Sequence, residues 1–186
     1  MTIFCTLGGP PVRYPDPAAA RRAEHHLLTV LRRCGADPHV ADIARGLSWA
    51  GEHGALWLAA GLAGAGADRT RRGAWLRATA LVAASHLTSM AVKRVVRRPR
   101  PPLVPLVRTA GRHGFPSSHA ASAAAAAVAF GALLPRAPFP PLAAAVCVSR
   151  LVAGVHYPTD VACGALLGGA VARLGRDWAL AGVRDD

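Results

Sequence analysis

Hydrophobic and polar positions divide the chain into an amphipathic N-terminal part and a longer, mostly apolar part. Residues 18–46 have the spacing of an amphipathic helix, which Gly35 and Pro38 are expected to break in two. Its apolar positions, set against a series of arginines, are Leu27, Leu28, Val30, Leu31, Val40 and Ile43. An Arg-rich amphipathic helix beside a membrane domain is typical of the membrane interface, and the alternative is an ordinary surface helix.

Five apolar segments follow, each roughly long enough to cross a hydrocarbon core of about 30 Å as a helix. They comprise residues 47–67, 74–92, 119–134, 140–157 and 159–175, and Glu52 and His53 interrupt the first. Any one of them could be a buried helix of a soluble protein. Five in succession with short basic connectors favour an all-α fold, a polytopic membrane helix bundle of about five spanning helices with an N-terminal amphipathic segment.

The same pattern predicts three parts of the chain. Residues 1–46 form a leader and amphipathic interfacial helices, and residues 1–17 are irregular because proline and glycine are frequent there. Residues 47–176 form the membrane domain, and residues 177–186 form a polar tail. The opening residues lack the long apolar region of a secretory signal.

Composition favours a lipid partner over a nucleic acid. Of the 186 residues, 52% are hydrophobic and 17% are charged, and the net charge is +12. The basic residues cluster beside apolar segments, which suits anionic lipid headgroups and phosphate substrates. Aromatic side chains that would stack on bases are sparse, so we expect no nucleic-acid partner. The four cysteines show neither the spacing of a zinc site nor a disulfide framework.

The first of three candidate motifs is the basic run from Lys93 to Pro101. A guanidinium can hold two phosphate oxygens at once, and an ammonium acts as a point charge. The alternative is a positive anchor that flanks a membrane helix.

The second motif is Pro116-Ser117-Ser118-His119, which precedes an Ala-rich segment. Ser117 or Ser118 could simply cap the helix. The same helix start also offers backbone N–H groups to an anion, and His119 could protonate an alkoxide leaving group.

The third motif combines Ser149-Arg150 with His156 and Asp160. An arginine inside an apolar segment is costly and is therefore a functional candidate. The spacing of four residues lets the Asp160 carboxylate accept a hydrogen bond from one nitrogen of His156, which leaves the other nitrogen more basic and nucleophilic.

Helix parity brings the three motifs to one end of the bundle, because successive spanning helices reverse direction. The motifs match the signature of the phosphatidic acid phosphatase type 2 superfamily, the lipid phosphate phosphatases that share a fold with vanadium haloperoxidases. The matching positions are Lys93…Arg100-Pro101, Pro116-Ser117-Ser118-His119 and Ser149-Arg150…His156…Asp160, with Ser118 where the pattern prefers Gly. Size, the Gly51-Glu52-His53 segment and the basic run also resemble the small actinobacterial members proposed to act on decaprenyl-phosphoryl phosphoribose.

This resemblance implies a role for each residue. Lys93, Arg100 and Arg150 would hold phosphate oxygens, with Ser117 and the Ser118 backbone adding hydrogen bonds. His156 would attack phosphorus to form a phosphohistidine, and Asp160 would orient it. His119 would protonate the leaving oxygen and then activate water. The resemblance implies no metal or other cofactor.

The sequence leaves the identity of the lipid phosphate and the oligomeric state open. Glu52 and His53 either read the headgroup or form an interfacial polar pair. Two other functions compete, a vanadate-dependent haloperoxidase and a non-enzymatic basic protein that binds membranes or nucleic acid. Lys and Arg are more frequent at the predicted active-site end, so the positive-inside rule predicts a multi-pass cell-membrane protein with a cytoplasmic active site.

Overall fold

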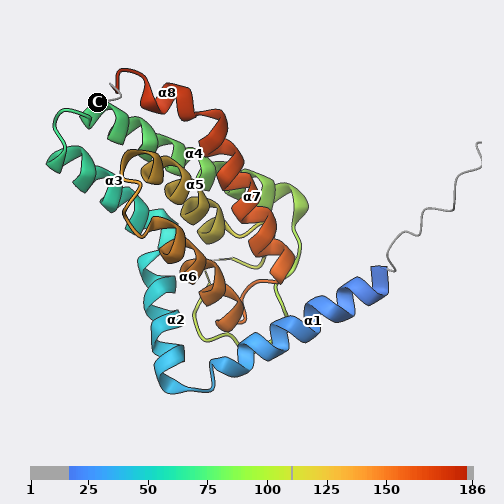
Figure 1. The fold of residues 1–186 in the computed structure, drawn as a ribbon. Coiled ribbons are helices and arrows are strands. Elements are labelled where there is room, and N and C mark those ends of the chain that lie inside the picture. The colour runs from blue at the N-terminus through green and yellow to red at the C-terminus, as the bar shows by residue number, and fades with distance from the viewer. Residues whose placement is uncertain (1–16, 110, 184–186) are drawn as a thin grey trace, which may run out of the picture.

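The computed structural model describes residues 17–109 and 111–183, and this part of the chain is all-helical (Figure 1). The all-α prediction is therefore confirmed. The predicted leader lies outside the described residues except for its last position. The elements in chain order are α1 (Pro17–Cys34), α2 (Pro38–Ala50), a short 3₁₀ turn η1 (Glu52–Gly54), α3 (Ala55–Ala67), α4 (Arg72–Val96), α5 (Ser118–Leu133), α6 (Phe139–Val152), α7 (Pro158–Leu174) and α8 (Arg176–Leu180).

Helix α5 occupies the centre of the bundle and contacts α4, α6 and α7. Most of its alanines are buried, and the aromatic part of the core lies beside them. The rings of Trp75 and Phe130 are 5.4 Å apart, and Trp57 packs in the same cluster. Small side chains on α5 allow the neighbouring helices to approach its backbone closely, as in membrane helix bundles.

The close contact between α5 and α7 positions two of the predicted motifs. A Cβ atom added at Gly168 would lie 1.9 Å from the carbonyl oxygen of Ala121, and one at Gly164 would lie 2.3 Å from that of Ser117. Any larger residue at either position would push the helices apart. The two glycines therefore hold the start of α7, which carries Asp160, against the start of α5.

Helices α1 and α2 lie across one end of the bundle (Figure 1). Helix α1 contacts α6 and α7, and α2 contacts α6. Leu28 is buried in this contact, whereas Leu27 and Val30 of the same predicted apolar face are exposed. Arg32 of α1 donates to the carbonyl oxygen of Val104, which fastens the helix to the loop between α4 and α5.

The predicted first and fourth apolar segments are each shorter as helices. Residues 47–67 do not form one helix, because His53 and Gly54 adopt left-handed conformations with φ of 53° and 76°. Helix α6 ends at Val152 instead of residue 157, and Gly154 turns the chain with φ of 70°. Within the described ranges, none of the helices combines the length and the apolar character needed to span a bilayer.

Candidate active site

A cavity of about 550 Å³ opens where α4 ends and α5 begins. It is lined by side chains from all three predicted motifs, namely Lys93, Arg100, Ser118, His119, Arg150 and His156. Glu52 and His53 also line it, whereas Ser117 and Asp160 are fully buried and do not. The structure thus gathers most of the predicted phosphate-handling residues around one space.

His156 lies in the loop between α6 and α7, with its two ring nitrogens facing different partners. Nδ1 lies 3.6 Å from Oδ2 of Asp160, slightly beyond a hydrogen bond. Nε2 lies 3.3 Å from Nη1 of Arg100. Because a guanidinium can only donate, Nε2 is the acceptor, and the hydrogen of a neutral ring sits on Nδ1 toward the carboxylate. The lone pair of Nε2 is on the cavity side.

Burial keeps this imidazole neutral. It lowers the pKa of His156 to about 4, although the Asp160 carboxylate acts to raise it and two nearby arginines lower it further. At neutral pH the resting ring is unprotonated on Nε2, which is the form that can attack an electrophile.

Asp160 is held by groups from three parts of the chain. Its Oδ2 accepts a hydrogen bond of 2.9 Å from the backbone N–H of Tyr157, and its Oδ1 accepts one of 2.9 Å from Nη1 of Arg98. Its backbone carbonyl accepts the N–H of Ser117 at 2.9 Å, which ties the start of α7 to the start of α5. A buried carboxylate needs such partners, and the Arg98 guanidinium supplies the opposite charge.

Glu24 of α1 completes this arrangement from outside the predicted motifs. Its carboxylate accepts hydrogen bonds from Nη2 of Arg98 at 2.8 Å and from the backbone N–H of Thr159 at 3.0 Å. Partial burial acts to raise the pKa of Glu24, but hydrogen bonds from Thr159 and Arg98 outweigh it and lower the pKa. The Arg98 guanidinium also lies 4.2 Å from the centre of the Tyr157 ring. Arg98 therefore positions Asp160, a role that the sequence analysis did not assign.

Arg150 is a buried guanidinium of α6 that makes no ion pair within the described residues. Its Nη1 donates to the hydroxyl of Ser48, and its Nε has no hydrogen-bond partner. A buried cation with an unsatisfied donor is costly, and an anion in the cavity would satisfy it. Lys93 and Arg100 also lack an ion pair in the described part of the chain, so three cations converge on the cavity and none of them is paired with a carboxylate.

Ser48 of α2 also positions His119, which lies in the first turn of α5. Nε2 of His119 is 3.1 Å from the carbonyl oxygen of Ser48, so this nitrogen carries a hydrogen. Gly51 makes room for the ring, because a Cβ there would lie 2.9 Å from Cδ2 of His119. Ser48 carries no signal in the sequence, since nothing in the pattern of α2 distinguishes it from other polar positions.

The two serines of the second motif have different positions. Ser118 lines the cavity, and its hydroxyl accepts a hydrogen bond of 3.3 Å from Nζ of Lys93. Ser117 lies behind the cavity as the N-cap of α5, and its hydroxyl accepts the N–H of Ala120 at 3.4 Å. Ser117 therefore does not line the cavity, and its contact with phosphate stays a prediction. The residue that replaces the preferred Gly supplies the accessible hydroxyl instead.

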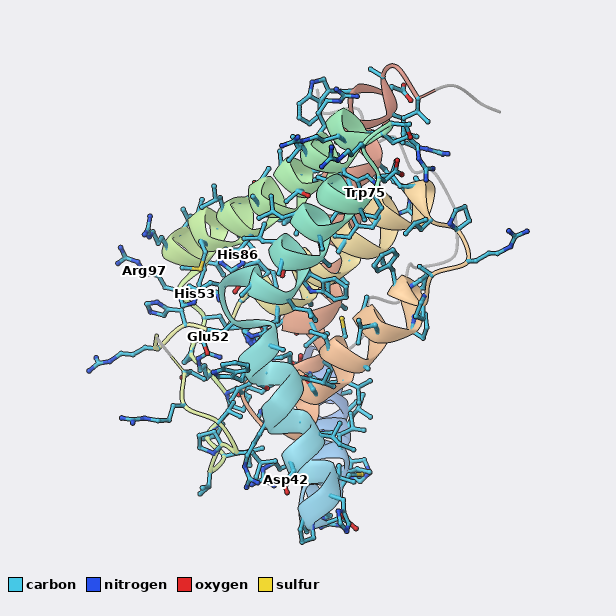
Figure 2. The ribbon with its side chains drawn as sticks, turned by 90° about the vertical axis from the view of Figure 1, so that its left-hand side faces the viewer. Asp42, Glu52, His53, Trp75, His86 and Arg97 are labelled. Carbon is cyan, nitrogen blue, oxygen red and sulfur yellow. The ribbon has the colours of Figure 1, made fainter. Side chains whose placement is uncertain are left out.

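Glu52 and His53 occupy the exposed rim of the cavity, between α2 and α3. Figure 2 shows them on the same side of the molecule as His86 of α4. The rings of His53 and His86 are 6.4 Å apart, and Nδ1 of His86 is buried without a hydrogen-bond partner. His86 lies inside an apolar helix with no motif around it, so the sequence offered no signal for it. Within residues 17–109 and 111–183, no cluster of His, Cys, Asp or Glu could hold a metal ion.

Comparison with known proteins places this geometry in a family. The profile of the PAP2 superfamily matches residues 74–182. Decaprenylphosphoryl-5-phosphoribose phosphatase of Mycolicibacterium smegmatis is 41% identical over 153 residues, which cover 78% of this chain and 83% of the relative. The enzyme of the same name from Mycobacterium tuberculosis H37Rv is 40% identical over 163 residues, which cover 83% and 90%.

Two solved structures share the fold. A transmembrane PAP2 type phosphatidylglycerolphosphate phosphatase from Bacillus subtilis has a TM-score of 0.72 and 23% identity, covering 89% of this chain and 90% of its own. A bacterial vanadium-dependent iodoperoxidase has a TM-score of 0.66 and 19% identity, covering 88% of this chain and 50% of its own. At such identities these structures support the helical arrangement alone.

Proposed function

The chain belongs to the PAP2 superfamily and is a phosphatase, and from this premise we propose that it is an integral membrane enzyme that hydrolyses a lipid phosphate through a phosphohistidine. The observation that carries the proposal is the meeting of three cations without ion pairs with Nε2 of His156 at one cavity. The substrate is a phosphate monoester or diphosphate of a polyprenyl lipid or a glycerolipid. The names of the mycobacterial relatives favour the polyprenyl class.

In the proposed first step, Lys93, Arg100 and Arg150 bind the phosphate oxygens. This binding satisfies the open donors and concentrates positive charge where the transition state becomes more negative. Nε2 of His156 attacks phosphorus, and the bond to the leaving oxygen breaks. Asp160 stabilises the positive charge that develops on the His156 ring.

Two proton transfers by His119 complete the cycle. The dianionic phosphate favours the imidazolium form of His119, which gives its proton to the leaving oxygen. The neutral ring then takes a proton from water as that water attacks the phosphohistidine. Inorganic phosphate leaves, and the His156 ring is restored. No step in this sequence uses a metal ion.

The test is release of phosphate by the protein purified in a neutral detergent with EDTA present. We expect hydrolysis of a polyprenyl phosphate and no oxidation of halide by hydrogen peroxide after addition of vanadate. Halide oxidation without phosphate release would favour the haloperoxidase. Release of phosphate from no lipid tested would contradict a lipid phosphatase and leave a binding protein.

Outward-facing apolar side chains support the membrane location. Leu62 of α3, Leu87 of α4, Val148 of α6 and Leu166 of α7 are all exposed. Large apolar side chains exposed on several neighbouring helices are typical of surfaces that contact lipid or a partner. Exposed Leu27 and Val30 of α1 favour an interfacial position for that helix. We propose a multi-pass cell-membrane protein on this basis.

Glu52 and His53 are proposed to contact the lipid headgroup. Alanine at both positions should change the ratio of kcat/KM for polyprenyl and glycerolipid phosphates by about tenfold, because discrimination depends on contacts outside the reacting group. The same variant should hydrolyse an activated aryl phosphate within about threefold of wild type. The control is Asp177→Ala with His39→Ala, two exposed side chains that do not line the cavity. An unchanged ratio would show that Glu52 and His53 do not read the headgroup.

We propose that the active site faces the cytoplasm, because the end of the bundle that holds it carries the excess of Lys and Arg. In a background without the native cysteines, Arg108→Cys should resist a membrane-impermeant thiol reagent in intact cells. Arg69→Cys, in the exposed turn before the opposite end of α4, should be labelled. The reverse pattern would place the active site on the outer face.

A further inference from the structure

The Asp160 carboxylate can reach His156 through one of its oxygens. A carboxylate oxygen offers about two lone-pair sites. Oδ2 of Asp160 uses one of them for the backbone N–H of Tyr157 at 2.9 Å, and Nδ1 of His156 lies 3.6 Å from the same oxygen. A further donor on Oδ2 would therefore compete with the His156 ring.

Arg98 is the donor that could take this position. Pairs of a guanidinium and a carboxylate are frequently bidentate, with two parallel N–H groups on the two oxygens. Here Nη1 of Arg98 donates to Oδ1 of Asp160 at 2.9 Å, and Nη2 donates to Oε2 of Glu24 at 2.8 Å. The guanidinium is thus divided between two carboxylates, which leaves Oδ2 of Asp160 open toward His156.

Glu24 is fixed where it can hold Nη2 of Arg98. Its side chain is 11% exposed, and its Oε1 accepts a hydrogen bond of 3.0 Å from the backbone N–H of Thr159, in the first turn of α7. The hydroxyl of Thr159 donates to the same oxygen. Helix α1 is fastened to the bundle by other contacts as well, because Leu28 is buried and Arg32 donates to the loop before α5 (Figure 1 shows α1 beside α6 and α7). A change at Glu24 therefore leaves the main attachments of α1 in place.

We propose that Glu24 is a positioning residue of the active site, which holds Nη2 of Arg98 away from Asp160. Oδ2 then stays available to the ring of His156. The proposal rests on the proposed phosphohistidine mechanism, in which Asp160 stabilises the charge that develops on that ring. Glu24 lies outside residues 74–182, which match the family profile. Without Glu24, Arg98 would form a bidentate pair with Asp160, and the ring would lose part of its acceptor as it becomes positive.

The first test uses Glu24→Gln, which keeps an oxygen for Thr159 and removes the charged acceptor of Arg98. Its kcat on a polyprenyl phosphate should fall about tenfold, because the weakened interaction develops in the transition state. KM and the affinity for vanadate should stay within about twofold of wild type, since the three cations that bind phosphate are unchanged. The matched control is Asp177→Asn, which removes an exposed carboxylate outside the cavity and should leave all three values within about twofold.

The second test repeats Glu24→Gln in an Arg98→Lys background. A lysine keeps the positive charge but lacks the planar fork that could cover both oxygens of Asp160. In that background Glu24→Gln should lower kcat by less than about a further twofold, so the two changes should be non-additive. A role of Glu24 through Thr159 alone would instead give the same loss in both backgrounds.

The third test does not depend on turnover. In protein with isotopically labelled histidine, kept in neutral detergent at neutral pH, the Nδ1–H proton of His156 should resonate further upfield in Glu24→Gln than in wild type. An Oδ2 that already accepts Arg98 polarises this proton less. Loss of the signal in His156→Ala identifies it. The resonance should not move in Asp177→Asn, nor when Glu24→Gln is added to Arg98→Lys.

Three results would overturn the role of Glu24. They are an Nδ1–H resonance that stays in place in Glu24→Gln, an equal change in the wild-type and Arg98→Lys backgrounds, and a loss of vanadate affinity as large as the loss of kcat. The last result would assign Glu24 to the integrity of the fold. A protein that shows the expected movement of the resonance but hydrolyses no lipid phosphate would contradict the proposed function and not the role of Glu24.

Discussion

Replacing His156 with alanine should abolish turnover, with kcat lowered at least about 10³-fold on every phosphate substrate. The substitution removes the atom that is proposed to attack phosphorus. Among the described residues, no other histidine that lines the cavity pairs with a carboxylate. Inorganic phosphate or vanadate should still bind within about threefold of wild type, because Lys93, Arg100 and Arg150 remain. A selective loss of chemistry distinguishes a nucleophile from a residue that only shapes the site.

The covalent step can be measured directly. Wild-type protein mixed with labelled substrate and quenched in alkali should retain label on a histidine, and His156→Ala should retain none. His26→Ala is the control, since His26 is exposed on α1 and does not line the cavity. Label that survives in His156→Ala would rule out this residue as the nucleophile. Loss of vanadate binding together with turnover would indicate collapse of the site.

The hydrophobic pattern predicted the central helices closely. The segments 74–92, 119–134 and 159–175 lie within α4, α5 and α7 to within a few residues. Long apolar runs bounded by proline or polar residues favour a helix, because a helix satisfies its backbone hydrogen bonds internally.

The breaks between helices were harder to predict, because hydropathy does not report backbone direction. Glu52 and His53 indicated an interruption in the first segment. The left-handed φ of His53 depends on tertiary packing that the sequence does not display, since non-glycine residues seldom adopt it. Similarly, residues 153–157 are apolar enough to extend α6, yet they form the loop that presents His156.

The site was predictable where motif spacing encodes it and not where distant helices supply it. Asp160 lies four residues after His156, across the start of α7, so the pairing was expected from the spacing alone. Glu24 and Ser48 reach the site from α1 and α2, far from the motifs in sequence. The position of Ser117 behind the cavity was also not predictable, because a capping serine and a phosphate-binding serine have the same sequence signature.

Replacing His119 with alanine should distinguish its role from that of His156 by the leaving group. On a lipid phosphate, whose alkoxide leaves poorly, kcat/KM should fall about 10²- to 10⁴-fold. On an activated aryl phosphate, which leaves without a proton, the loss in the first step should be below about tenfold. Steady-state rates on both substrates give this ratio, and Ser48→Ala is the matched control. That change removes the hydroxyl bound to Arg150 but keeps the carbonyl oxygen beside His119, so both substrates should lose activity equally.

The second step gives an independent measurement of the same residue. If His119 also activates water, His119→Ala should form the phosphohistidine from an aryl phosphate and then hydrolyse it slowly. Label trapped on the protein during turnover should therefore rise above the wild-type level, since the step that consumes the intermediate has lost its base. Equal losses on the two substrates would contradict the general-acid role. Faster loss of trapped label in the variant than in wild type would contradict the general-base role, because removing the base can only prolong the intermediate.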